Sequence, residues 1–140
     1  MKLDGQAPVR ALMTSAVVSL SPSHRVWEAQ ELFASCGLHH LPVIDEHRRL
    51  LGMVCHTDLY RAGVDAELPA GAPPLEGAQR VPIARVMRRD PVTIGPDATV
   101  ERAVTLFAAG TFHALPVVDA DERLVGILTT TDVLRRLLGR

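Results

Sequence analysis

The chain contains the same segment twice. Residues 9–63 match residues 83–137 when the sequence is shifted by 74 positions without a gap, and nineteen positions are identical. Unrelated segments would share only about a handful of identities, so the sequence indicates a duplication. The identical residues include Met13/Met87, Pro22/Pro96, Val26/Val100, Leu41-Pro42-Val43/Leu115-Pro116-Val117, Gly52/Gly126 and Thr57-Asp58/Thr131-Asp132.

Each copy is too small to bury a large core by itself, since domains of about 60 residues are marginally stable. We therefore expect the two copies to pack through their sheets as a pseudo-two-fold pair. The predicted boundaries are 9–63 for the first repeat and 81–138 for the second. The stretch 64–80 is rich in Pro, Gly and Ala and is typical of a linker.

Both copies predict the element order β-α-β-β-α, which places the chain in the α/β (α+β) class. Short apolar runs at 17–20 and 92–94 open the copies as β-type segments. Ser23 and Asp97 predict helix starts, because both residue types cap helices well. The expected helical faces are Val26, Ala29, Leu32, Phe33 and Cys36, and Val100, Ala103, Val104 and Phe107. The expected strands are 41–45 and 50–54, and 115–119 and 124–128, with last helices from about 56 and 130.

Composition argues against several classes of protein. Fifteen Lys and Arg against sixteen Asp and Glu give a net charge of −1, so no overall field draws the chain to nucleic acid or an anionic membrane. No apolar run reaches the roughly 18 residues of a membrane span, and no signal peptide is visible. Cys36 and Cys55 form neither a disulfide framework nor a metal set. These features predict a cytoplasmic protein with reduced thiols, in which Cys36 is a small core residue.

Thr129 and Asp132 stand before an apolar helix in the pattern T-x-x-D, which has two interpretations. The pattern is a capping box, in which side chain and backbone satisfy each other at a helix start. It also suits a nucleotide, because free N–H groups attract phosphate and a carboxylate can accept both ribose hydroxyls. The first repeat keeps Asp58 but has Cys55, a poor cap, at the threonine position. A carboxylate retained without its capping partner favours a second use.

Both copies share the run P-x-x-x-V, a helix, LPV-h-D, a turn and R-L-h-G-h-h-x-x-T-D, where h is apolar. This run closely resembles the CBS domain, and the tandem pair resembles a stand-alone Bateman module. The resemblance implies two clefts between the repeats that often bind AMP, ADP, ATP, S-adenosylmethionine or NAD. It also implies that pairs associate, so we expect a homodimer that acts on an unknown regulated partner. We expect that the protein requires no cofactor and that its ligand is AMP, ADP or ATP.

The resemblance also assigns residues to the two clefts, because each combines the T-x-x-D region of one repeat with strand residues of the other. It assigns Thr14, Ser19, Leu38, His39, Ile127, Thr129 and Asp132 to the main cleft. The second cleft would use Met53, Cys55, Asp58, Arg88, Thr93, Phe112 and His113. Both departures from the family pattern, Cys55 and Arg88, fall in the second cleft. We therefore expect the Asp132 cleft to be the main nucleotide site, although Arg88 could itself contact a phosphate.

The histidines and Cys55 leave alternatives open. His39 and His113 are repeat equivalents, which either contact ligand phosphate, as the resemblance implies, or are half-buried strand residues bonded to backbone carbonyls. The histidine and cysteine spacings fit no metal-site pattern, so we expect no metal. Cys55 stands near a helix start, where a thiol can become reactive, and is a candidate for redox modulation.

Catalytic motifs such as G-x-S-x-G, H-E-x-x-H and the Walker loop do not occur, so we expect no enzyme activity. Asp58 and Asp132 are repeat equivalents, which favours two related pockets over an acid–base pair. The expected function is a regulatory module that senses an adenine nucleotide or another adenosine compound. The alternative is a structural module that dimerises without binding nucleotide. Neither interpretation involves nucleic acid or a membrane.

Overall fold

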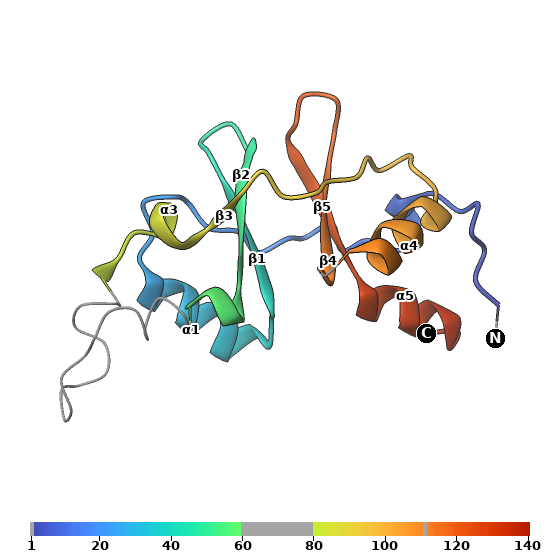
Figure 1. Cartoon of the computed structure of the whole chain (residues 1–140), viewed down its shortest axis with the longest axis horizontal. Helices are drawn as coiled ribbons and strands as arrows, with labels where there is room; N and C mark the ends of the chain where they lie inside the picture. Colours follow the sequence, from blue (N-terminus) through green and yellow to red (C-terminus); the bar gives the residue numbers. More distant parts are fainter. Residues whose placement is uncertain (1, 60–79, 111) are drawn as a thin grey trace. The chain divides into compact units, whose positions relative to one another are not determined.

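A computed structural model of the chain describes residues 2–59, 80–110 and 112–140 (Figure 1). The chain divides into two compact units. The central unit comprises residues 18–90, and the C-terminal unit comprises residues 1–17 and 91–140. Most of the predicted linker 64–80 lies outside the described residues.

The two structural units do not coincide with the two sequence repeats. The first residues of each repeat pack in the unit that contains most of the other repeat. Residues 9–17 are part of the C-terminal unit, and residues 81–90 are part of the central unit. Val9 is fully buried with Leu115 and Leu128 in the core of the C-terminal unit. Ile83 is fully buried in the core of the central unit. The burial of these side chains anchors the two exchanged segments.

The central unit contains a three-stranded antiparallel sheet of order β1-β2-β3. Its elements are α1 (Val26–Cys36), β1 (His40–Ile44), β2 (Leu50–Cys55), a helical turn at 56–59, α3 (Ile83–Val86) and β3 (Arg88–Arg89). The first predicted apolar run contributes one parallel bridge, Leu20 to Val43, rather than a full strand. The core consists of buried aliphatic side chains with Phe33 of α1.

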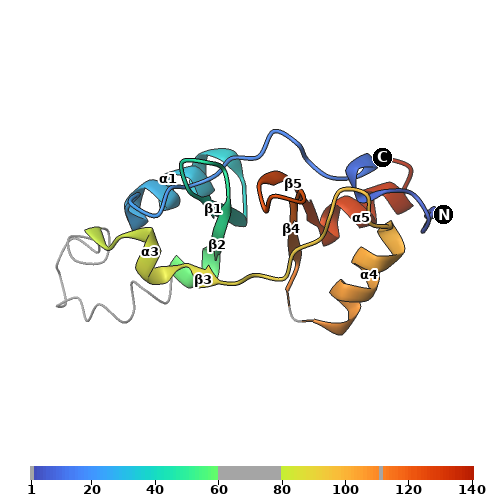
Figure 2. The same cartoon turned by 90° about the horizontal axis from the view of Figure 1, so that it is seen from above.

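The C-terminal unit repeats this plan. Its elements are η1 (Val9–Ala11), α4 (Val100–Ala109), β4 (Ala114–Val118), β5 (Leu124–Thr129) and α5 (Thr130–Leu137). Strands β4 and β5 pair antiparallel, and Ile94 forms a parallel bridge to Val117. Helices α4 and α5 lie side by side (Figure 2). The predicted α+β class and the two predicted strand pairs are confirmed.

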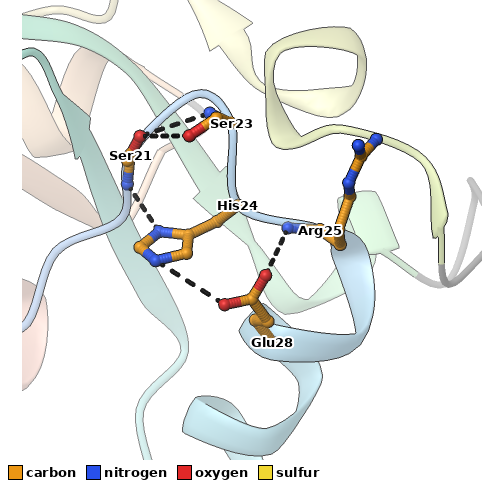
Figure 3. A network of polar contacts seen from close by, with 5 residues as sticks. All are labelled: Ser21, Ser23, His24, Arg25 and Glu28. Atoms are coloured by element: carbon orange, nitrogen blue, oxygen red, sulfur yellow. Dashed lines mark hydrogen bonds and ion pairs between the residues drawn. The ribbon is translucent and has the colours of Figure 1, made fainter.

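The helices begin two residues later than the predicted caps. Helix α1 follows Arg25 and α4 follows Thr99, whose hydroxyl accepts the N–H of Arg102 at 3.1 Å. Ser23 instead contacts the Ser21 hydroxyl, and the Ser21 N–H donates to Nδ1 of His24 at 2.8 Å (Figure 3). The N–H of Arg25 donates to Glu28 at 3.0 Å and fixes the start of α1. Ser23 and Asp97 as caps are therefore wrong. At each proline the chain first forms a turn, closed by the N–H of His24 to the Ser21 carbonyl at 3.1 Å and by the N–H of Ala98 to the Gly95 carbonyl at 3.2 Å.

Two predicted core positions on the helices are also wrong. Cys36 is exposed, because α1 ends there and Gly37 turns the chain with φ 63°. Val104 of α4 is exposed as well. The buried stripe of each helix is therefore narrower than the sequence pattern indicates, and in α1 it ends at Phe33.

Candidate functional site

Thr129 and Asp132 form a complete capping box at the start of α5. The N–H of Thr129 donates to Oδ2 of Asp132 at 2.8 Å, and the N–H of Asp132 donates to the Thr129 hydroxyl at 3.1 Å. The capping interpretation is thus confirmed. The cap uses only one of the two carboxylate oxygens. Asp132 is partly exposed, and its Oδ1 has no hydrogen-bond partner within the part of the chain that the structure describes.

Thr14 lies next to this cap through backbone pairing. Its N–H donates to the Ile127 carbonyl at 2.9 Å, and the N–H of Ile127 donates back to Thr14 at 3.0 Å. The C-terminal unit therefore brings together four members of the predicted main set, namely Thr14, Ile127, Thr129 and Asp132. Thr14 is exposed and Ile127 is partly exposed, so both are accessible from solvent. Ser19, Leu38 and His39 belong to the central unit.

A surface hollow of about 150 Å³ borders Asp132 on one side of α5. Its remaining lining consists of Ala11, Leu12, Arg135, Arg136 and Arg140. None of the three arginine side chains forms an ion pair with a described residue, so together they give the hollow a positive charge. Sequence reasoning missed this cluster, although Arg135 and Arg136 follow Asp132 by three and four residues, a spacing that places them on the same side of α5.

Asp58, the repeat equivalent of Asp132, has a different environment. Its Oδ2 accepts the backbone N–H of Cys55 at 3.0 Å and lies 3.0 Å from the Cys55 sulfur. Its Oδ1 accepts from Nε of Arg88 at 3.1 Å. The carboxylate side chain is only 6% exposed, whereas the arginine side chain is 60% exposed. A buried carboxylate is thus held by hydrogen bonds on both oxygens.

Burial acts to raise the pKa of Asp58, but the hydrogen bonds from Cys55 and the ion pair with Arg88 outweigh it. The net effect is a pKa below the usual value of an aspartate. A depressed pKa in the folded state means that ionised Asp58 stabilises the fold at neutral pH. This contribution is present above the pKa of unfolded aspartate, about 3.9, and is lost as pH falls through the folded pKa.

We expect Asp58→Asn to lower the free energy of unfolding by about 1–3 kcal/mol at pH 7, because the charge that binds Arg88 is lost. The difference from the unsubstituted chain should shrink once the pH falls below about 4. Urea unfolding of both proteins between pH 3 and pH 7 measures this. The exposed Asp121→Asn is the control, and a difference for Asp58→Asn that stays constant with pH would contradict the assignment.

The remaining members of the predicted second set divide between the units. Arg88 pairs with Met53 across β2 and β3, as Thr14 pairs with Ile127. Phe112 of the C-terminal unit contacts Phe107, with ring centroids 6.2 Å apart. Thr93 is exposed and borders a hollow of about 470 Å³, lined by residues 93–98 and 118–120, which sequence reasoning did not find.

The structure decides one of the alternatives left open for the histidines. His39 and His113 are exposed and precede β1 and β4 rather than lying half-buried within them. Their backbone carbonyls accept the N–H of His56 at 3.1 Å and of Thr130 at 2.9 Å. The half-buried interpretation is therefore wrong, and both imidazoles face solvent.

Across residues 2–59, 80–110 and 112–140, no group of three or more His, Cys, Asp or Glu side chains is placed to hold a metal ion. Among the helices of the same ranges, none combines the length and the apolar character needed to cross a membrane.

Three features are typical of one protein family: the strand pairing, the equivalent aspartates Asp58 and Asp132, and the two similar units. The sequence matches the CBS domain over residues 9–65 and again over residues 83–139. The chain belongs to the CBS domain family. Two domains of this family account for most of its length, and the resemblance inferred from the sequence is confirmed.

Similar solved structures support the same fold. CBSX2 of Arabidopsis thaliana in complex with AMP has a TM-score of 0.81 and 28% identity, with 94% of this chain and 97% of that chain covered. The CBS domain pair of protein MJ0100, in complex with 5-methylthioadenosine and S-adenosyl-L-methionine, has a TM-score of 0.80 and 23% identity. That match covers 95% of this chain and 97% of the MJ0100 chain. At this identity, the second match shows the fold alone.

Curated relatives include much longer proteins. Inosine-5'-monophosphate dehydrogenase of Korarchaeum cryptofilum is 32% identical over 120 residues, which are 86% of this chain but 22% of the dehydrogenase. The chain spans about a fifth of the length of the first curated relatives that it matches. The similarity to these enzymes therefore concerns only that part of each protein.

Proposed function

We propose that the protein is a regulatory module that binds an adenine nucleotide, with the ribose on Asp132. The observation that carries this proposal is the partly exposed Asp132 carboxylate, which keeps Oδ1 available although Oδ2 caps α5. A ribose offers two neighbouring hydroxyl donors, and a carboxylate oxygen accepts them well. The AMP complex of the similar protein CBSX2 supports the choice of an adenosine ligand.

The charges around Asp132 favour a ligand with phosphate groups. Arg135, Arg136 and Arg140 line the hollow beside the carboxylate, and guanidinium groups pair well with phosphate oxygens. The exposed hydroxyl of Thr14 provides a further donor. We therefore rank AMP, ADP and ATP above S-adenosylmethionine, which has no phosphate, with NAD as a further candidate. Ser19, Leu38 and His39, the other members of the predicted main set, belong to the central unit.

Regulation requires that the ligand bind one conformation of the protein more tightly than another. A nucleotide with this preference would shift the chain towards the conformation that it binds, which a partner protein or a second copy of the chain could recognise. A ligand with equal affinity for both forms would bind without any regulatory effect.

Isothermal titration calorimetry of the purified chain against AMP, ADP, ATP, S-adenosylmethionine and NAD tests the proposal. We expect a phosphate-bearing adenosine compound to bind, with one equivalent per chain, and to raise the melting temperature. Titration in increasing salt should weaken binding, because the arginine–phosphate contribution is partly screened. Absence of binding by all five compounds would contradict the proposed function.

An assembly module without a nucleotide is the second candidate, and the surface of α5 favours it. Leu134 and Leu138 are each 58% exposed and lie one helical turn apart. Exposed leucines at this spacing are typical of a helix that packs against another chain. Light scattering of the chain and of Leu134→Lys/Leu138→Lys, combined with the calorimetry, distinguishes assembly with ligand binding from assembly alone.

A further inference from the structure

The two repeats present equivalent carboxylates with unequal partners. Within the described residues, the Asp132 carboxylate accepts a hydrogen bond only from the N–H of Thr129, on Oδ2, which leaves Oδ1 available. Asp58 has both oxygens in hydrogen bonds, and the bond to Oδ1 comes from Arg88, thirty residues further along the chain. The residue that occupies the position of Arg88 in the C-terminal unit is Thr14. Both residues pair by their backbones with the strand before the carboxylate, Arg88 with Met53 and Thr14 with Ile127.

We propose that Arg88 is an internal occupant of the first repeat's nucleotide site and limits the chain to one ligand. The guanidinium takes the carboxylate oxygen that a ribose would need, so Asp58 is unavailable while Asp132 remains open. This inference rests on the proposed function, since it assumes that the open carboxylate binds ribose. It makes Arg88 a residue that determines how many ligands the protein binds.

A ribose competes poorly with Arg88 for three physical reasons. A hydrogen bond between two ionised groups is roughly twice as strong as one between neutral groups. The guanidinium belongs to the same chain and pays no cost of association, whereas a free ligand does. The Asp58 side chain is only 6% exposed, so a ligand gains access to it only after Arg88 moves away. If one molecule in about a hundred has Arg88 displaced, the apparent affinity falls about a hundredfold.

Arg88 could instead bind a ligand phosphate, and this alternative predicts the opposite effect of substitution. The arginine side chain is 60% exposed, and Nε is the donor in its bond to Asp58. An arginine that recruits phosphate contributes to affinity, so its removal weakens binding. An arginine that occupies the site opposes binding, so its removal creates a second site. The sign of the change therefore separates the two roles.

The test compares the number of ligands bound by the unsubstituted chain, Arg88→Thr and the double variant Cys55→Thr/Arg88→Thr. The double variant gives the central unit threonines at the two positions that correspond to Thr14 and Thr129 of the C-terminal unit. Both variants leave Asp58 buried without its cation, but the double variant adds a threonine that can cap the helix turn at Asp58, so it serves as a second test if the single variant misfolds. Arg89→Thr is the matched control, since it removes an exposed arginine from the same strand β3 and leaves the hydrogen bond between Arg88 and Asp58 in place. Calorimetry with AMP and ATP gives the stoichiometry, and circular dichroism reports folding.

We expect one equivalent of nucleotide for the unsubstituted chain and for Arg89→Thr, and two equivalents for the folded Arg88 variants. One equivalent or fewer in both Arg88 variants would overturn the inference. Two equivalents in the unsubstituted chain would also overturn it while leaving the proposed function intact. An unsubstituted chain that binds no nucleotide would contradict the proposed function itself, so the two failures are distinguishable.

Discussion

Asp132→Ala lowers the affinity for the adenine nucleotide by roughly ten- to a hundredfold. The expected loss corresponds to hydrogen bonds between the ribose and a charged acceptor, about 1.5–3 kcal/mol. Asp58→Ala should change the affinity far less, because Arg88 and Cys55 already occupy that carboxylate. Calorimetry of both variants against the tightest-binding nucleotide measures the contrast. Equal losses, or a larger loss for Asp58→Ala, would contradict the assignment of Asp132 as the main site.

The capping role of Asp132 requires its own control, because loss of a helix cap costs about 0.5–2 kcal/mol of stability. Asp132→Asn keeps an oxygen that can accept the N–H of Thr129, so it preserves much of the cap while removing the charge. We expect this variant to melt close to the unsubstituted chain but to bind nucleotide more weakly. If it binds as tightly as the unsubstituted chain, the carboxylate acts only as a cap.

Gly126→Ala destabilises the C-terminal unit and weakens nucleotide binding together. A methyl group at Gly126 would lie 2.5 Å from the Met13 sulfur and 3.0 Å from the Thr14 carbonyl oxygen. The Met13 side chain can rotate away, but the Thr14 carbonyl belongs to the backbone, so relief of the overlap shifts the segment that carries Thr14 by a few tenths of an ångström relative to β5, where it pairs with Ile127. Overpacking of this kind costs about 1–3 kcal/mol. In a chain of this size that corresponds to a fall of roughly 3–15 °C in melting temperature.

Gly95→Ala is the matched control for this experiment, since a methyl group there meets no atom within 4 Å. We expect Gly95→Ala to leave the melting temperature nearly unchanged. Thermal unfolding with and without nucleotide measures both effects for each variant. A Gly126→Ala protein that melts normally would show that the Met13–Thr14 segment does not pack tightly against β5.

Local patterns in the sequence were sufficient for most of the fold. The duplicated LPV-h-D and R-L-h-G-h-h segments predicted both strand pairs, because apolar residues that must be buried repeat within a few positions of one another. Thr129-x-x-Asp132 predicted the capping box for the same reason, since its two hydrogen bonds join residues three positions apart. Because the two copies are equivalent, the sequence also predicted that Met53 and Ile127 occupy the same position in their strands.

Contacts between distant residues decided the rest. The family resemblance assigned Thr14 and Arg88 to the T-x-x-D region of the opposite repeat, but local sequence patterns carried no signal for their contacts. The exchange of residues 9–17 and 81–90 between the units depends on which core buries Val9 and which buries Ile83. Because the two cores are built from similar apolar residues, hydrophobicity alone does not distinguish them. Arg88 reaches Asp58 only because β3 pairs with β2. The sequence by itself therefore determined the family, the elements and the pair of carboxylates. Tertiary structure alone decided that one carboxylate is held by an arginine while the other is open, because a charge on a short exposed strand has no periodicity that reveals its partner.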